Sequence, residues 1–168
     1  MSSGPRAPVA YHQNNADSVI KGFLSASYRH QVAGSLRRAD RTWEPTRENP
    51  MANDVDIVTT QPLDSVRKGL GRNKATGGAH VLTTTIAGSK INIIKAEPRS
   101  FGATLMYATG PKGSNIRNRM IAKQKGWKLN ADGLWDANGR LLASSERSIY
   151  TALGKTWRPA ERRGTPRR

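Results

Sequence analysis

The 168-residue sequence contains no cysteine, few acidic residues and no long apolar run. The absence of cysteine excludes disulfide bonds and thiolate metal sites. No apolar stretch reaches the roughly 18 residues that a membrane-spanning helix needs, and the polar residues 1–15 lack the core of a signal peptide. Neither a Ser-His-Asp arrangement nor a GxxxxGKS loop is present, which argues against hydrolase and P-loop functions. What remains is a soluble chain with room for one compact domain or two small lobes.

The shortage of acids makes the chain strongly basic. It has 12 Asp and Glu against 28 Lys and Arg, a formal net charge of +16. Residues 1–84 carry a net +4 and residues 85–168 a net +12, and the segment 109–128 has six bases and no acid. A field of one sign attracts phosphate backbones and releases their counterions. The charge therefore predicts nucleic-acid binding, although a solvated basic face would have the same composition.

Hydrophobic periodicity and turn residues predict an α+β fold in two lobes. Residues 15–98 form the first lobe and residues 99–160 a smaller basic lobe, between a flexible start (1–14) and a basic tail (161–168). We expect helices at 17–26, 63–70, 101–107, 114–125 and 145–153, the last capped by Ser144. We expect strands at 29–33 and 53–60, a hairpin of 80–86 with 90–96 around the turn 87–89, and short strands within 129–143. Trp127, Trp135 and Trp157 are expected to build the core of the second lobe.

Asp54 and Asp56 are the most informative acidic pair. Two residues apart on a strand, their carboxylates project from one face, ~7 Å apart along the chain. Like charges this close are unfavourable unless a cation lies between them, and oxygen ligands favour Mg²⁺ or Mn²⁺. The same pattern also occurs on the exposed face of an ordinary amphipathic strand.

A second motif, GSLRR at residues 34–38, directly follows a predicted strand. Its glycine permits close approach of the backbone to a ligand, the serine hydroxyl can hold a phosphate oxygen, and arginine adds a two-pronged donor. A turn with two solvated arginines would look identical. Beside a metal pair one strand away, the motif becomes a candidate cradle for a triphosphate.

Taken together, these motifs resemble those of family X DNA polymerases. The resemblance runs in order from about residue 17 to residue 163. Its motifs are residues 34–38, 54–58, 101–110, Asn115, 128–134 and 149–157. It implies a nucleotidyltransferase palm at 15–98 and a thumb-like lobe at 99–160, without room for the N-terminal regions of larger members.

The resemblance also implies a role for each site residue. The catalytic and metal positions are 54, 56 and 92, with Asp54 and Asp56 bridging two Mg²⁺ or Mn²⁺ ions. Ser35 and Arg38 would hold the triphosphate, Tyr107 would lie against the sugar, and Arg119 would lie near the template. The nucleotide-binding set is Gly34, Ser35, Arg38, Tyr107, Gly110 and Asn115, with Asn115 at the minor-groove edge of the new pair. The DNA-binding set is Lys112, Arg117, Arg119, Lys123, Lys125 and Lys128.

Asn92 stands where the family has its third carboxylate, twelve residues before Thr104. Asparagine is a weak metal ligand and cannot accept the proton of a primer 3′-hydroxyl, and losing a general base costs ~10²–10⁴ in rate. Glu97 lies five residues after Asn92, near the end of the strand, and its side chain would point to the opposite face of the sheet. It is therefore not expected to replace the missing third carboxylate. Three interpretations stay open: an engineered change, a natural protein that binds but hardly polymerises, or a mistaken register.

Three smaller departures from the family also lead to expectations. Pro111 follows Gly110 at the thumb entrance and predicts a cis bond between them. Ala108 replaces a common phenylalanine, which would relax selection of deoxyribose over ribose. The segment 39–53 is longer than expected, and its Trp43 either stacks on a base or packs.

The resemblance implies a DNA polymerase that adds dNMP to a primer 3′ end, as in gap-filling repair. Its partners would be primed or gapped DNA and dNTP, with no membrane, in a monomer located in the cytoplasm or nucleoid of a cell or encoded by a virus or phage. A non-catalytic DNA- and nucleotide-binding module and an untemplated transferase remain alternatives. Fidelity and the preferred DNA substrate do not follow from the sequence.

Overall fold

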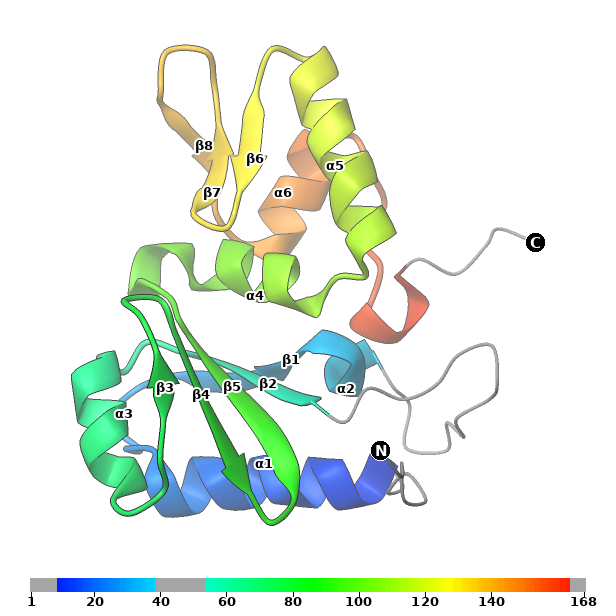
Figure 1. Cartoon of the computed structure of the whole chain (residues 1–168). Coiled ribbons are helices and arrows are strands. Elements are labelled where there is room, and N and C mark those ends of the chain that lie inside the picture. Colours follow the sequence, from blue (N-terminus) through cyan, green and yellow to red (C-terminus); the bar gives the residue numbers. More distant parts are fainter. Residues whose placement is uncertain (1–8, 39–53, 164–168) are drawn as a thin grey trace.

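The protein folds as an α+β chain of two lobes, as expected from the sequence (Figure 1). The structure is a computed structural model and describes residues 9–38 and 54–163. The predicted loop 39–53 with Trp43, and the bases Arg167 and Arg168, lie outside the described residues. In the described part of the chain, no helix combines the length and apolar character needed to cross a membrane.

The N-terminal lobe is built on a mixed five-stranded sheet of order β1-β2-β5-β4-β3. Strand β2 is antiparallel to β1 and parallel to β5, which is the central strand. Strands β4 and β5 form the predicted hairpin around Ala87 and Gly88, whose φ angles of 52° and 79° suit a two-residue turn. The strands are β1 (His30–Ala33), β2 (Asp54–Thr59), β3 (Thr76–Gly77), β4 (Val81–Ile86) and β5 (Ser89–Lys95).

One face of this sheet is covered by α1 (Val9–Phe23) and α3 (Leu63–Leu70), which matches the predicted helix 63–70. The main core of the lobe lies between them and includes Val19, Val55, Ile57, Val66 and Ile91. The predicted alternation of β2 is confirmed, because Val55 and Ile57 are buried while the aspartates on either side of Val55 are partly exposed. Packing of one face therefore leaves the acids on the other.

Helix α1 begins at Val9, so the expectation of a flexible segment over 1–14 is wrong for residues 9–14. His12 is buried, and its Nδ1 lies 3.1 Å from the Ser89 Oγ. Asn15 Nδ2 donates to the same hydroxyl at 2.9 Å. Burial lowers the pKa of His12. These contacts with the hairpin extend the helix beyond what local periodicity predicts.

The C-terminal lobe combines a three-stranded antiparallel sheet of order β6-β7-β8 with three helices. Ser145, not the predicted Ser144, caps α6, accepting from the Ser148 backbone at 3.1 Å. The lobe's elements are α4 (Phe101–Thr109), α5 (Lys112–Gln124), β6 (Lys128–Asn130), β7 (Gly133–Trp135), β8 (Leu141–Ala143) and α6 (Glu146–Ala152).

The core of this lobe mixes aliphatic and aromatic side chains, with Leu134, Ile149 and Tyr150 at its centre. Trp127 and Trp157 pack against it, as expected. Trp135 does not belong to this cluster, and its indole Nε1 donates to Asn130 Oδ1 at 3.2 Å. The hydrogen bond to Asn130, at the turn between β6 and β7, holds the indole ring outside the core cluster.

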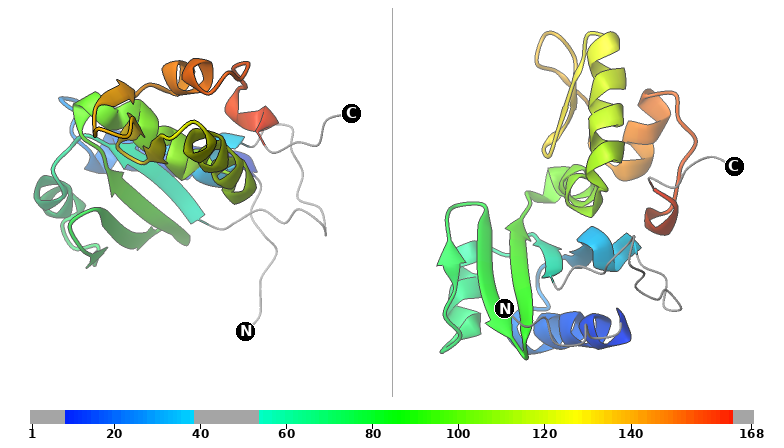
Figure 2. Two further views of the ribbon diagram at one scale, coloured as in Figure 1. Left: turned by 90° about the horizontal axis from the view of Figure 1, so that it is seen from above. Right: turned by 45° about the vertical axis from the view of Figure 1, so that its right-hand side comes forward.

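Helix α4 lies between the two lobes (Figures 1 and 2). On one side Phe101 and Leu105 pack with Ala33 and Val58 on the second face of the N-terminal sheet. On the other side α4 supplies residues to the C-terminal core. The short helix α2 (Gly34–Arg38) contacts α4 as well, and a 3₁₀ turn (Ala160–Arg162) near the C-terminus contacts α2. These contacts form one wall of the candidate site.

Candidate active site

A cleft of about 440 Å³ opens between α2, β2 and the junction of α4 with α5. It brings together residues from both lobes that are far apart in sequence. Every predicted nucleotide-binding residue lines it, together with the two aspartates. The lining residues are Gly34, Ser35, Arg38, Asp54, Asp56, Tyr107, Ala108, Thr109, Gly110, Pro111, Lys112, Asn115 and Arg119.

Asn92 lies directly beside Asp56, because β2 and β5 pair in parallel with these two residues in register. Asn92 Nδ2 donates to Asp56 Oδ1 at 2.8 Å, and Thr83 Oγ1 donates to Asn92 Oδ1 at 2.9 Å. The position counted from the sequence therefore lies next to the acidic pair, which removes the interpretation of a mistaken register. Glu97 lies beyond the end of β5, and its carboxylate is within 3.4 Å of the Lys95 ammonium.

Asp56 lies in a half-buried environment that disfavours its negative charge. Burial raises the pKa of Asp56, and the neighbouring carboxylate of Asp54 adds to the rise, while the bond from Asn92 and the charges of Lys90 and Arg38 oppose it. Lys90 Nζ lies 3.9 Å from Asp54 Oδ2. Carboxylates held in this way gain stability from a cation between them.

The donor set fits a hard divalent ion. Within the described residues, no group of three or more His, Cys, Asp and Glu side chains is placed to hold a metal, so the charged ligands would be the two aspartates alone. Oxygen donors of this kind select Mg²⁺ or Mn²⁺. The oxygen of the Asn92 amide accepts from Thr83 and is not directed at Asp56.

The GSLRR segment forms the basic side of the cleft. Gly34 begins α2 immediately after β1 with φ of 65°, a conformation that favours glycine. Burial lowers the pKa of Arg38, against the opposing charge of Asp56. Among the described residues, Arg38 Nε is buried without a hydrogen-bond partner. A half-buried guanidinium facing a polar cleft is suited to an anionic ligand.

Replacing Gly34 by alanine should lower the free energy of unfolding by about 1–3 kcal/mol. The added Cβ would collide with the Asp56 carboxylate, in addition to the strain of a positive φ. Gly126→Ala is the matched control, because Gly126 also has a positive φ (77°) but open space around it. Urea denaturation measures both. If both variants lose the same free energy of unfolding, the contact between the added Cβ and Asp56 does not destabilise the protein.

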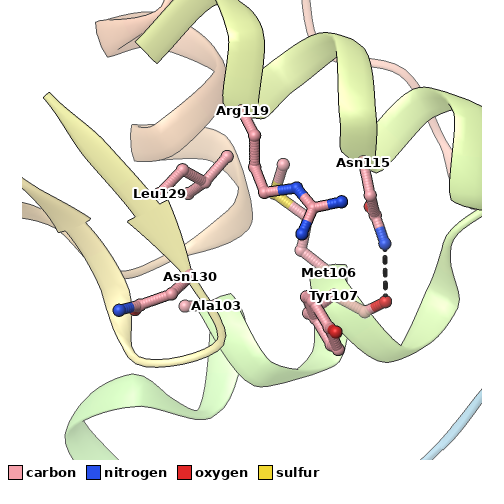
Figure 3. A pocket seen from close by; sticks show the side chains of 7 residues that line it. All are labelled: Ala103, Met106, Tyr107, Asn115, Arg119, Leu129 and Asn130. Atoms are coloured by element: carbon pink, nitrogen blue, oxygen red, sulfur yellow. Dashed lines mark hydrogen bonds between the residues drawn. The ribbon is translucent and has the colours of Figure 1, made fainter. Parts of the chain in front are cut away.

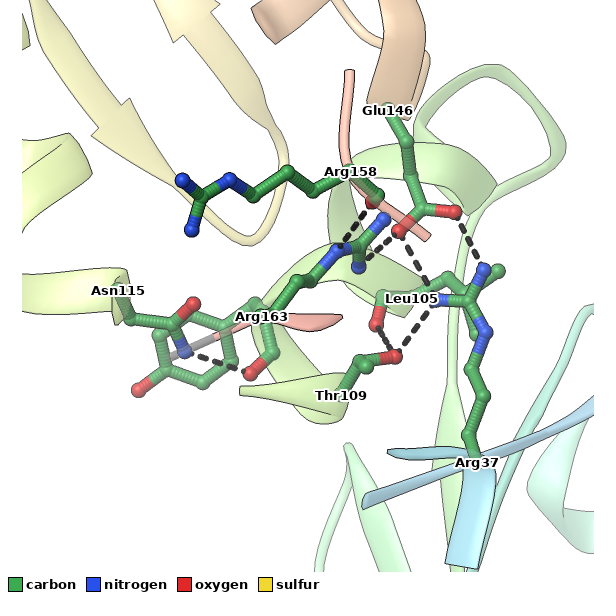
Figure 4. Close-up of polar contacts among 8 residues, drawn as sticks. Arg37, Leu105, Thr109, Asn115, Glu146, Arg158 and Arg163 are labelled. Carbon is green, nitrogen blue, oxygen red and sulfur yellow. Dashed lines mark hydrogen bonds and ion pairs between the residues drawn. The ribbon is translucent and has the colours of Figure 1, made fainter. Parts of the chain in front are cut away.

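Arg37 does not face the cleft and instead joins the two lobes (Figure 4). Its guanidinium donates to both carboxylate oxygens of Glu146 on α6, at 2.7 and 2.9 Å, and to Thr109 Oγ1 at 2.8 Å. Arg163 Nη1 donates to Glu146 Oε2 at 2.6 Å. Burial alone would raise the pKa of Glu146, but the bonds and charges of the two arginines outweigh it and lower the pKa.

This network corrects the expectation of a basic tail for residues 161–163, the part of 161–168 that the structure describes. Arg162 belongs to the terminal 3₁₀ turn, and the Arg163 side chain is only 1% exposed. A buried arginine requires a partner, which Glu146 supplies. Glu146 was not singled out from the sequence, since an acid in the first turn of a helix is ordinary. Its partners lie 109 and 17 residues away along the chain.

Beside the cleft, α4 and α5 enclose a much smaller depression of about 10 Å³ (Figure 3). Asn115 Nδ2 donates to the Tyr107 carbonyl at 2.8 Å, which joins the two helices. Between the helices, the Gly110–Pro111 bond is cis, as predicted. The depression is lined by Ala103, Met106, Tyr107, Asn115, Arg119, Leu129 and Asn130. Tyr107, Asn115 and Arg119 line both spaces and mark where the cleft meets the C-terminal lobe.

The six predicted DNA-binding bases are all exposed, but they do not form one face. Lys112 and Arg119 line the cleft, and the other four do not. Arg117 and Arg119 are about 200° apart around α5, so they cannot both face the cleft. Lys125 lies 5.6 Å from the Trp127 ring centroid. The six bases are therefore spread over α5 and the segment that follows it, which suits a diffuse field better than one fixed line of contacts.

Comparison with known proteins agrees with this geometry. Residues 104–164 match the family model for the DNA polymerase beta thumb. The whole fold is similar to Leishmania infantum polymerase beta in a ternary gap complex, with a TM-score of 0.77 over 96% of this chain and 72% of that one. The C-terminal lobe therefore matches a DNA polymerase beta thumb, and the chain as a whole has a polymerase beta-like fold.

The likeness of the chain to known proteins is uneven along its length. The polymerase beta structure shares 16% identity with it and therefore supports the fold alone. Altogether 233 chains of solved structures match, and no curated protein matches the sequence. The matched thumb contains α5 and α6, so Asn115, Arg119 and Glu146 fall within the part related by sequence.

Proposed function

We propose that the chain is a metal-dependent DNA nucleotidyltransferase that adds dNMP to a primer 3′ end, as in gap filling. One observation carries the proposal: Asp54 and Asp56 share a cleft with the GSLRR segment and with the first turns of a basic helix. Acids able to hold divalent ions thus face bases able to hold a triphosphate. This combination is what phosphoryl transfer by positioning and charge neutralisation requires.

Each side of the cleft would have a separate task. Asp54 and Asp56 would hold Mg²⁺ or Mn²⁺, which when bound neutralises the triphosphate and acidifies the attacking hydroxyl. Ser35 and Arg38 would bind the triphosphate from the opposite side. Tyr107, which is exposed at the cleft, would lie against the sugar, and Asn115 against the base edge. The family resemblance suggests these roles, and the shared cleft supports them.

Asn92 supports a second candidate function, a module that binds DNA and nucleotide with little catalysis. Its amide is neutral and donates to Asp56, so it cannot take a proton from a primer hydroxyl. The two candidates differ only in the chemical step. Both require DNA and nucleotide as partners, and for both we propose a monomeric intracellular protein with its palm in residues 15–98 and its thumb in 99–160.

Extension of a primer on DNA with a one-nucleotide gap tests the enzyme directly. We expect slow, template-dependent addition with Mg²⁺ or Mn²⁺, and loss of at least about 10²-fold in Asp54→Asn, because a metal ligand is removed. Fluorescence anisotropy measures DNA and nucleotide binding in parallel. Binding without extension would favour the non-catalytic module. Extension without a template would indicate an untemplated transferase instead.

Replacing Ala108 by phenylalanine is expected to increase discrimination against ribonucleotides by about tenfold. Ala108 lines the cleft next to Tyr107, and a larger side chain there narrows the space beside the sugar. The ratio of kcat/KM for dNTP and rNTP measures the effect. An unchanged ratio would show that Ala108 does not set sugar selection.

A further inference from the structure

A row of three polar side chains crosses the N-terminal sheet beside the candidate site. The register places Thr83 on β4 opposite Asn92 on β5, and Asn92 opposite Asp56 on β2. Thr83 Oγ1 donates to Asn92 Oδ1 at 2.9 Å, and Asn92 Nδ2 donates to Asp56 Oδ1 at 2.8 Å. An ionised carboxylate only accepts hydrogen bonds, so the amide presents its NH₂ group to Asp56 and its oxygen to Thr83. Each of the two bonds therefore fixes the orientation that the other requires.

The two carboxylate oxygens of Asp56 have different surroundings. Oδ1 is turned toward β5 and accepts from Asn92. Oδ2 lies against Gly34 at the start of α2, where an added Cβ would collide with it. Gly34, Asp54 and Asp56 line the cleft, whereas Asn92 is not among the lining residues. The Oδ2 side of Asp56 is therefore the side that it shares with the GSLRR segment.

Hydrogen-bond donors lie on the β5 side of the acidic pair. Lys90 lies opposite Asp54 in the parallel register, with its Nζ 3.9 Å from Asp54 Oδ2. The NH₂ group of Asn92 has the equivalent position beside Asp56. A divalent ion requires oxygen ligands, whereas ammonium and amide N–H groups repel a cation. The β5 side of the pair is thus unsuited to a cation, and the two aspartates together carry the charge that balances one divalent ion.

We propose that Thr83 and Asn92 restrict this site to one divalent ion, held by the two aspartates on the side of the GSLRR segment. The inference rests on the proposed function and changes its metal requirement, because the family resemblance implies two ions. The Asn92 amide donates to Asp56 where a second ion would otherwise be bound, and Thr83 holds the amide in that orientation. Neutralisation of the triphosphate is retained, whereas activation of the primer hydroxyl by a second ion is lost.

Counting Mn²⁺ ions in the nucleotide complex tests the inference. A fixed amount of dATP is saturated with protein, without a primer so that no reaction occurs, and the electron paramagnetic resonance signal of free Mn²⁺ gives the number bound. We expect one ion per nucleotide with the parent and two with Asn92→Asp, which replaces the N–H donor by a carboxylate oxygen. Asn138→Asp, on an exposed turn of the thumb, is the control and should bind one. Two ions with the parent, or one with Asn92→Asp, would overturn the inference.

Thr83→Val tests the role of the hydroxyl group separately. Valine keeps the size of the side chain but cannot donate, so the Asn92 amide is free to turn its oxygen toward the aspartates. We expect a second ion in this variant, bound about tenfold more weakly than in Asn92→Asp, because the added ligand is neutral. Thr85→Val is the matched control, because Thr85 lies on the same face of β4 but opposite Lys90, and it should leave one ion. One ion in both valine variants would overturn the role of Thr83.

Binding of a fluorescently labelled dNTP in the presence of Mn²⁺ separates this inference from the proposed function. By anisotropy, we expect the parent to bind the nucleotide and Asp54→Asn to bind it at least about tenfold more weakly, because a metal ligand is removed. Failure of the parent to bind the nucleotide would overturn the proposed function. A nucleotide complex of the parent with two ions would overturn the inference alone. Circular dichroism melting checks that every variant is folded.

Discussion

Replacing Asn92 by aspartate should raise the rate of primer extension by about 10²–10⁴-fold. The parallel register of β2 and β5 places residue 92 beside Asp56. A carboxylate there could accept the proton of the primer hydroxyl and provide a third charged metal ligand. Single-turnover extension of gapped DNA with Mg²⁺ measures the change.

The same substitution should destabilise the metal-free protein. Asn92→Asp loses the bond donated to Asp56 and brings a third carboxylate into a site where burial already raises the pKa of Asp56. The melting temperature should therefore fall in EDTA and recover with Mg²⁺. Asn138→Asp, the same change on an exposed turn of the thumb, is the control and should alter neither property. Equal rates of primer extension by the parent and Asn92→Asp would mean that another group acts as the base. No primer extension by either protein would favour the non-catalytic binding module.

Replacing Glu146 by alanine should lower the free energy of unfolding by about 3–5 kcal/mol. The substitution leaves the buried Arg163 without its acidic partner and removes both carboxylate bonds of Arg37. The loss of one member of a buried charge network costs far more than the loss of a surface pair, because the remaining charge stays desolvated. Urea denaturation of the parent and the variant measures the difference.

Glu97→Ala is the matched control, since the Glu97 side chain is 74% exposed and its pair with Lys95 should contribute less than about 1 kcal/mol. A second check is pH. The arginines lower the pKa of Glu146, so its contribution is complete above its ordinary pKa and is lost as pH falls through the folded value. The parent should therefore lose its advantage over Glu146→Ala in acid, below about pH 4.5. A stability difference that persists unchanged there would show that the carboxylate charge is not responsible.

The strands and the hairpin followed from the sequence because their information is local. The alternation of β2 decides which face is buried, and turn residues at 87–88 set the register of β4 and β5. The position of Asn92 was reached differently, by counting twelve residues back from Thr104 in the family pattern. The parallel register of β2 and β5 places that residue beside Asp56.

The start of α1 and the role of Glu146 could not be predicted in this way. The helix extends to Val9 because His12 and Asn15 meet Ser89, more than seventy residues away. Arg37 stands next to Arg38 in the sequence, but neighbouring residues on a helix point about 100° apart and only Arg38 lines the cleft. Pairings between distant segments leave no periodic trace in the sequence.

Helix α4 also limits how the molecule can be divided. Phe101 and Leu105 complete one core, whereas Ala103 and Met106 complete another. If the chain were divided before α4, the second face of the N-terminal sheet would lose Phe101 and Leu105 and become exposed. If it were divided after α4, the core of the C-terminal lobe would be exposed to water. The two halves are therefore poor candidates for exchange as independent modules, and a chimera with a related protein should inherit both from one parent.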